Sequence, residues 1–134
     1  MLQLKTPDAY ELLTKYVYSV IRSTASGVFL TNRPAWITIG RNSVDVPVEI
    51  LASGLAHEAY HCKLYCEYKD PHPGERVPGE VASGREAGLK CIAYDLDALR
   101  RLGASEEMVR SEIRSSEEAI QREFWKTRWE HRTW

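Results

Sequence analysis

The stretch "SGLAHEAYHCKLYC", residues 53–66, holds two histidines four positions apart and a glutamate directly after the first. In a helix, His57 and His61 project from the same side, ~5–6 Å apart, so that both can bind one tetrahedral metal ion. Glu58 is rotated by ~100° about the helix axis and therefore faces a water on the metal instead of joining the pair as a ligand. The pattern predicts a zinc site that includes both histidines. The competing interpretation is an ordinary helix with two polar-face histidines and a solvated Glu58.

The chemistry that this pattern indicates is hydrolysis. Zinc lowers the pKa of its bound water towards ~7 and polarises the carbonyl of the bond to be cleaved. Glu58 takes the proton of the zinc-bound water as general base and hands it to the leaving amine. We therefore expect a zinc-dependent peptidase that hydrolyses peptide bonds. A metal-dependent hydrolase of a non-peptide bond would use the same site and would differ only in its substrate.

Length and composition predict a single globular domain over residues 1–134, because 134 residues suit one core. Eighteen Lys and Arg against nineteen Asp and Glu give a formal net charge of -1, which disfavours binding to nucleic acid or to an anionic bilayer. The first residues lack the features of a secretory signal, and no apolar run has the length of a membrane span. Three cysteines do not suggest a disulfide framework. A cytoplasmic protein without nucleic-acid or membrane partners is expected.

The spacing of apolar residues predicts an α+β, mostly helical fold. A small sheet or hairpin lies over the helix that carries the motif, a ligand helix follows, and a long helix ends the chain. The first predicted element is a helix after Thr6-Pro7-Asp8 that runs through Ile21 and ends at Ser26-Gly27. The other predicted elements are strands over Val28–Leu30 and Ala35–Ile39, and helices over about Val46–Tyr68, Ser83–Leu102 and from Ser105 towards the end. Residues 69–84 hold three prolines and three glycines and are predicted to form a loop.

A catalytic zinc site has three protein ligands and one open position, and the sequence leaves the third ligand open. No histidine lies six residues after His61. Glu86 is the preferred candidate, because it begins a helix, where a ligand is held more rigidly than in a loop. It has a second explanation, since Ser83-x-x-Glu86 is the spacing of a helix capping box. The other candidates downstream are Glu80, His72 and Glu75.

Residues 35–104 resemble the gluzincins, the HExxH zinc peptidases whose third ligand is a glutamate on a second helix. The likeness is greatest to their small single-domain forms, the minigluzincins, and to metallopeptidase domains of phages and mobile elements. It rests on the HExxH and on "SGREAGLKCIAYDLDALRRLGA" (83–104), which is similar to the ligand helix of these proteins. It implies a zincin-like fold in which "AWITIG" (35–40) is an edge strand that holds an extended peptide by β-strand addition.

The resemblance also implies roles for single residues. His57, His61 and Glu86 would be the zinc ligands and Glu58 the general base. Better-known gluzincins have an acidic residue four positions after the ligand glutamate, which orients a histidine, and Lys90 stands there in this sequence. The candidates that could replace this carboxylate are Asp95 and Asp97.

Other residues of the sequence have two interpretations each. The thiols of Cys62, Cys66 and Cys91 are expected to be buried as small hydrophobes, with ligation by a thiolate as the alternative. The hydroxyls of Tyr60, Tyr65 and Tyr94 are candidates to stabilise an oxyanion, and each ring could equally belong to the core or its rim.

The Trp-rich tail "FWKTRWEHRTW" (124–134) has three interpretations. It could cap the core, bind a partner, or fold back into the cleft and inhibit the enzyme, as small gluzincins do. The alternative for the whole chain is a non-catalytic helical module, either stabilised by zinc or free of metal, that acts as a regulator or binds a partner. Oligomeric state and natural substrate do not follow from the sequence.

Overall fold

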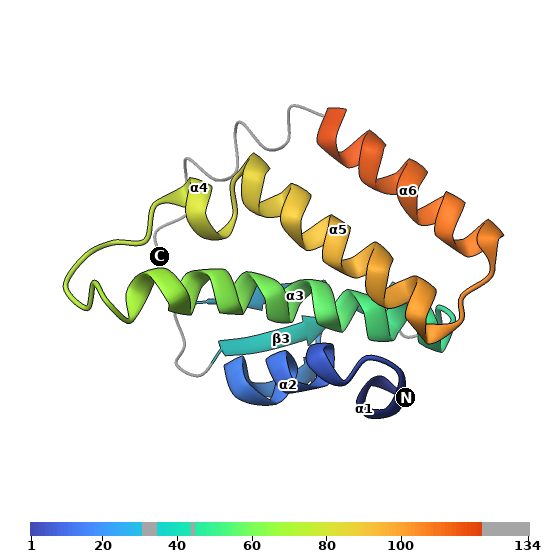
Figure 1. The fold of residues 1–134 in the computed structure, drawn as a ribbon, viewed down its shortest axis with the longest axis horizontal. Coiled ribbons are helices and arrows are strands. Elements are labelled where there is room, and N and C mark those ends of the chain that lie inside the picture. Colours follow the sequence, from blue (N-terminus) through green and yellow to red (C-terminus); the bar gives the residue numbers. More distant parts are fainter. Residues whose placement is uncertain (31–34, 44, 122–134) are drawn as a thin grey trace.

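The computed structural model describes residues 1–30, 35–43 and 45–121 and folds them into a mostly helical α+β arrangement with one small sheet (Figure 1). This confirms the predicted fold class at that level. The elements in chain order are α1 (Leu2–Lys5), α2 (Pro7–Tyr16), β1 (Val17–Arg22), β2 (Gly27–Phe29), β3 (Ala35–Ile39), the short 3-10 helix η1 (Arg41–Ser43), α3 (Val48–Lys69), α4 (Gly79–Ala82), α5 (Arg85–Leu102) and α6 (Glu106–Gln121). No helix in these ranges combines the length and the apolar character that crossing a membrane requires. The tail at 124–134 lies outside the described residues.

The first predicted helix is wrong in its second half. The prediction runs through Ile21, but α2 ends at Tyr16 and the chain continues as strand β1. The segment "VYSVIR" is rich in β-branched and aromatic residues, which favour a strand. Its apolar positions also fit a helical spacing, so the pattern alone does not separate the two. Pairing with β3, which is distant in sequence, gives the segment its extended form.

The sheet has the strand order β1-β3-β2, with β1 parallel and β2 antiparallel to β3. The predicted strand over Ala35–Ile39 is confirmed, but its predicted place at the edge of the sheet is wrong. β3 is hydrogen-bonded on both sides, with Ile37 opposite both Val20 and Val28. A central strand has no unpaired backbone groups to offer an extended peptide, so β-strand addition at β3 is excluded.

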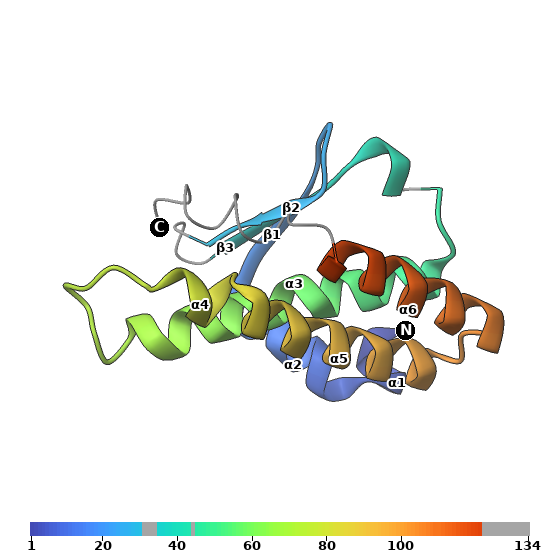
Figure 2. The same cartoon turned by 90° about the horizontal axis from the view of Figure 1, so that it is seen from above.

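Helix α3 carries the HExxH motif and lies at the centre of the molecule, between α2 and α5 in Figure 1 and with the sheet along a further side in Figure 2. It confirms the helix predicted over about Val46–Tyr68. α5 packs on α3 and runs in the opposite direction (Figure 1). Small buried residues are frequent on both helices and allow close packing, and Ala56 of α3 and Ala98 of α5 lie in one core cluster with Ala9 of α2.

The connection between α3 and α5 contains a short helix, α4, where the sequence predicted only a loop. Gly84 allows this tight arrangement, because a Cβ atom there would lie 2.7 Å from the Cα of Glu80. Gly84 is also the N-cap of α5, and no side chain caps this helix end, so the predicted capping box of Ser83 and Glu86 does not form. The predicted end of α5 is confirmed, since Gly103 adopts a left-handed φ of 91°.

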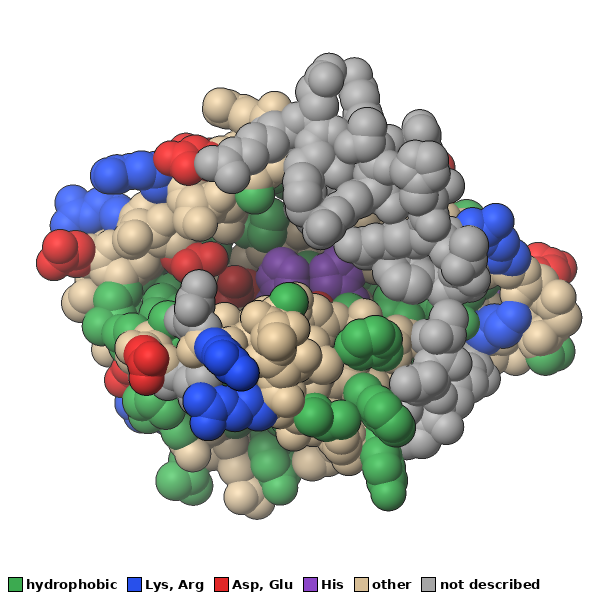
Figure 3. All heavy atoms as spheres, turned by 180° about the vertical axis from the view of Figure 1, so that it is seen from behind, with side chains coloured by type: hydrophobic (Ala, Val, Ile, Leu, Met, Phe, Trp, Pro, Cys, Tyr) green, Lys and Arg blue, Asp and Glu red, His purple; other side chains and the backbone are tan. Residues whose placement is uncertain are grey.

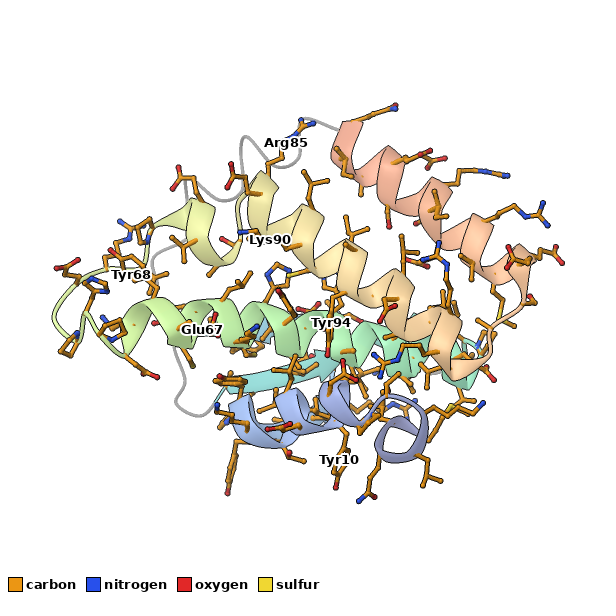
Figure 4. All side chains as sticks on the ribbon, in the orientation of Figure 1. Tyr10, Glu67, Tyr68, Arg85, Lys90 and Tyr94 are labelled. Carbon is orange, nitrogen blue, oxygen red and sulfur yellow. The ribbon has the colours of Figure 1, made fainter. Side chains whose placement is uncertain are left out.

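An ion pair ties the N-terminal helices to α5. The two terminal nitrogens of the Arg101 guanidinium donate to Asp8, at 3.1 and 2.5 Å. The hydroxyl of Tyr94 donates to the same carboxylate at 2.8 Å, and Figure 4 shows this side chain directed from α5 towards α2. Lys5 adds a bond from its ammonium to the carbonyl of Leu102 at 2.6 Å. These contacts join α1 and α2 to the second half of α5.

We expect the Asp8→Asn variant to be less stable than the parent by about 0.5–1 kcal/mol at neutral pH, because the pair is largely exposed and screened by solvent. The Arg101 guanidinium lowers the pKa of Asp8 to about 2 in the folded chain, against about 3.9 in an unfolded one. The stabilisation is therefore complete above about pH 4 and disappears as the pH falls towards 2. Urea unfolding of both proteins across this range measures it.

The matched control for this prediction is Asp45→Asn, which makes the same change at an exposed carboxyl. It should leave the free energy of unfolding unchanged at every pH. A difference between parent and Asp8→Asn that stayed constant from pH 7 to pH 2 would contradict the assigned role of the ion pair.

Candidate metal centre

Helix α3 presents His57 and His61 on one side, as the i, i+4 spacing requires. Their ring centroids are 5.0 Å apart, and the rings are tilted by 57° to each other. His61 is buried, with 8% of its surface exposed, and His57 is partly buried. Both rings lie on the side of α3 that borders α5, where water has limited access.

A backbone carbonyl fixes the tautomer of His61. Nδ1 of His61 lies 2.6 Å from the carbonyl oxygen of Ala82 on α4. A carbonyl oxygen can only accept, so Nδ1 carries the proton and the lone pair is on Nε2. A metal-ligating histidine is commonly oriented in this way by a bond from its other nitrogen. The short helix α4 and Gly84 therefore serve the site, because they bring this carbonyl to the ring.

Cys91 on α5 completes a group of three possible metal ligands. One ligand atom from each of His57, His61 and Cys91 can be chosen such that all three lie within 4.8 Å of one another, and the group is the only one of its kind in the described ranges. Two imidazoles and one thiol are a donor set typical of zinc. Three protein ligands are also the number found in catalytic zinc sites. These residues could thus hold a metal ion.

The surroundings of Cys91 favour a neutral thiol until a cation is present. The residue is fully buried. Burial raises the pKa of its thiol well above the ordinary value, and the negative charge of Glu58 raises it further. A bound metal ion reverses this balance, because a coordinating thiol loses its proton.

Asp95 lies one turn after Cys91 on α5 and faces His57. Its Oδ2 atom is 3.7 Å from Nδ1 of His57, slightly beyond a hydrogen bond. Burial on its own would lower the pKa of His57, but the carboxylates of Asp95, Glu58 and Glu112 hold that pKa above its usual value. Asp95 itself is 6% exposed, and its Oδ1 atom is buried with no hydrogen-bond partner.

A recess of about 210 Å³ reaches the neighbours of His57, since Glu58 and Asp95 are part of its wall. Three carboxylates line it: Glu58, Asp95 and Glu112 of α6. The rest of its lining is mainly aliphatic and comes from β3, the first half of α3 and Val46, with the hydroxyls of Ser26 and Ser43 at its border. Figure 3 shows the histidine side chains at the floor of a hollow on this face, with acidic side chains beside them. The glutamate of the HExxH motif thus borders both the ligand group and an accessible space.

The structure does not bring Glu86 to the histidines. Glu86 lies in the first turn of α5 with its side chain exposed, and Cys91 stands in its place in the ligand group. The five positions that separate them turn the side chain by ~140° and shift it by ~7.5 Å along the axis. The other predicted candidates are elsewhere as well. Glu75 and Glu80 are exposed, and the ring of His72 contacts the carbonyl of Tyr68 at 2.8 Å.

Cys91 was interpreted from the sequence as a buried small hydrophobe, and its burial is confirmed. Its membership of the ligand group was the less favoured alternative. The spacing to Asp95 is the signal that indicates it, because Asp95 stands four positions after Cys91. The resemblance predicts an acidic residue at this spacing after Glu86, where Lys90 stands. Of the candidate phenols, Tyr65 is buried in the core and the hydroxyl of Tyr94 donates to Asp8.

Comparison with known proteins gives no family. No model of a protein family, no curated protein and no solved structure matches the chain. The assignment of a function therefore depends on the geometry of the site.

Proposed function

We propose that the chain is a zinc-dependent peptidase in which His57, His61 and Cys91 hold the ion and Glu58 is the general base. The observation that carries the proposal is the convergence of two imidazoles and a thiol from two helices, next to a recess that Glu58 lines. The order of elements, a small sheet, an HExxH helix and a following helix that supplies a ligand, supports a zincin-like fold. The proposed substrate is a peptide.

Each residue of the site would have a separate role in peptide hydrolysis. Zinc, when bound, supplies a Lewis acid that polarises a carbonyl and acidifies a water. Glu58 would accept a proton from the attacking water and deliver it to the leaving nitrogen. Asp95 would fix the ring of His57, and the carbonyl of Ala82 the ring of His61. The carbonyl of Ala82 holds Nδ1 of His61, and Asp95 faces Nδ1 of His57, so each ring would bind the ion through Nε2.

The number of ligands favours catalysis over a purely structural role. Structural zinc sites are closed by four protein ligands, whereas catalytic sites keep one position open. The described residues supply three. A non-catalytic module stabilised by zinc is the alternative, and it would bind the ion without hydrolysing peptides.

Removal and return of zinc test the proposal. The protein is incubated with a mixture of peptides of diverse sequence, and new fragments are followed by mass spectrometry. Chelation should slow hydrolysis by at least about a hundredfold, because the ion supplies several kcal/mol of transition-state stabilisation. Addition of one equivalent of zinc should restore the rate. Equal hydrolysis with and without metal, or none in the zinc-loaded protein, would contradict the proposal.

A further inference from the structure

The recess holds more negative charge than proton transfer requires. Glu58 alone suffices as general base, yet Asp95 and Glu112 line the same space. Asp95 is more than nine-tenths buried, and its Oδ1 atom, which has no hydrogen-bond partner, belongs to a residue of the recess wall. An acceptor that is buried without a partner costs free energy, and a donor bound in the recess would offset this cost.

No lysine or arginine of the described chain lines the recess. Glu112 is partly buried, and its pKa is raised by burial and by the nearby charge of Asp95. Two carboxylates in this position attract a cation that can also donate hydrogen bonds, because charge-assisted bonds are the strongest that such groups make. A protonated amine has both properties.

The remaining wall is suited to an apolar group. Its aliphatic side chains come from Ile37, Ile39, Val46, Ile50, Leu51 and Leu55. A Cβ atom added at Gly54 would meet nothing within 4 Å, so the space extends to the backbone of α3. The volume of about 210 Å³ greatly exceeds the ~10–15 Å³ that one water needs. It can receive an aliphatic side chain.

We propose that this recess binds the N-terminal residue of a peptide, with its α-ammonium held by Asp95 and Glu112 and its side chain on the aliphatic wall. The protein would then be an aminopeptidase, an inference that rests on the proposed function. The acids lie beside Glu58 and His57, where the reacting atoms would be. An α-ammonium is separated from the scissile carbonyl by a single Cα, whereas the ammonium of a lysine side chain lies several bonds further away.

The reaction consumes one water for each residue released. The oxygen of the water bonds to the carbonyl carbon of the first residue, and the bond from that carbon to the nitrogen of the second residue breaks. Both protons of the water end on the new amino group, one of them by way of Glu58. The products are a free amino acid as carboxylate and a peptide shortened by one residue, with an ammonium at its new N-terminus.

A binding measurement tests the recess without turnover. In the Glu58→Gln protein, calorimetry compares L-leucine amide with N-acetyl-L-leucine amide, which lacks the positive charge. The free amine should bind at least about tenfold more tightly, the usual effect of one charge-assisted hydrogen bond. The same preference is expected after zinc is removed. This measurement separates an amine that is bound by the carboxylates from an amine that coordinates the zinc ion directly. Equal binding of the two compounds, or a preference seen only with zinc, would overturn the inference.

Two variants on α6 make the assignment specific. Glu112→Gln should reduce the preference for the free amine to about threefold or less. The matched control is Glu117→Gln, an exposed glutamate on the same helix, which should keep the full preference. Gly54→Leu should weaken binding of L-leucine amide by filling the apolar part of the recess. An unchanged preference in Glu112→Gln would show that the amine binds elsewhere.

Peptide hydrolysis then separates the two proposals. The zinc-loaded parent should release the first residue of a free peptide and act at least about tenfold more slowly on its N-acetylated form. Equal cleavage of internal bonds in both forms would overturn the aminopeptidase and leave the peptidase intact. Cleavage of the acetylated peptide next to an internal lysine would identify a side-chain ammonium as the occupant and would also overturn it. If neither peptide is cleaved, the proposed function itself fails.

Discussion

Replacement of Glu58 by glutamine is expected to lower kcat/KM for peptide hydrolysis by about a thousandfold, within the range for loss of a general base, and to leave the zinc content unchanged. Glutamine has nearly the same shape but cannot accept the proton of the attacking water. Glu58 lines the recess and is not a member of the ligand group, so its charge is not needed to hold the ion. Steady-state kinetics and metal analysis of the same preparation measure both quantities.

Glu67→Gln is the matched control for this variant. Glu67 lies on the same helix, is exposed (Figure 4) and pairs with Lys63 at 3.8 Å. The control should retain the rate and the zinc of the parent. Hydrolysis by Glu58→Gln at the rate of the parent would rule out Glu58 as the base, and loss of zinc from this variant would make it a ligand instead.

Replacement of Cys91 by alanine is expected to weaken zinc binding by at least about a hundredfold, because one of three protein ligands is lost. His57→Ala should have the same effect. Competition with a chromogenic chelator measures the affinity. Cobalt(II) in place of zinc gives a second measurement, since absorption from a thiolate-to-metal transition should be present in the parent and absent in Cys91→Ala.

Two control variants decide between the alternatives for the third ligand. Cys66→Ala removes a thiol from α3 that lies outside the ligand group, and it should keep the affinity of the parent. Glu86→Gln changes the ligand that the sequence favoured, and it should also keep it. Loss of zinc from Glu86→Gln with retention in Cys91→Ala would require a different arrangement of α5 and would restore the ligand set that the sequence suggested.

Much of the helical framework could be predicted from the sequence. The motif helix is long and bounded by clear signals, and it was predicted to within two residues at either end. The cap of α6 could be predicted too, because the chemistry of a cap is local: the Ser105 hydroxyl accepts the amide of Met108 at 3.2 Å. Structural features that depend on a few neighbouring residues can be predicted from the local sequence pattern.

The features that were missed depend on contacts between distant segments. β1 is a strand because β3 pairs with it, and β3 is central because β1 takes its second side. Cys91 faces the histidines because α5 packs on α3, and contacts of Tyr94 and Arg101 with Asp8 tie the same helix to α2. The sequence around a buried cysteine is the same whether its thiol packs in the core or binds a metal ion. Only the register of α5 against α3 separates these two interpretations of Cys91.

The bond from His61 to the carbonyl of Ala82 makes the connection between α3 and α5 part of the metal centre. An ion bound at Nε2 would strengthen this bond, and the bond in turn orders α4. The order of α4 and the binding of zinc are therefore linked. Bound zinc should stabilise the segment between α3 and α5 against local opening, and an ordered segment should raise the zinc affinity by the same free energy. A molecule that binds residues 69–84 would therefore alter the metal affinity without contacting a ligand. The rate of amide hydrogen exchange in α4 would report the fraction of the protein that has bound the ion.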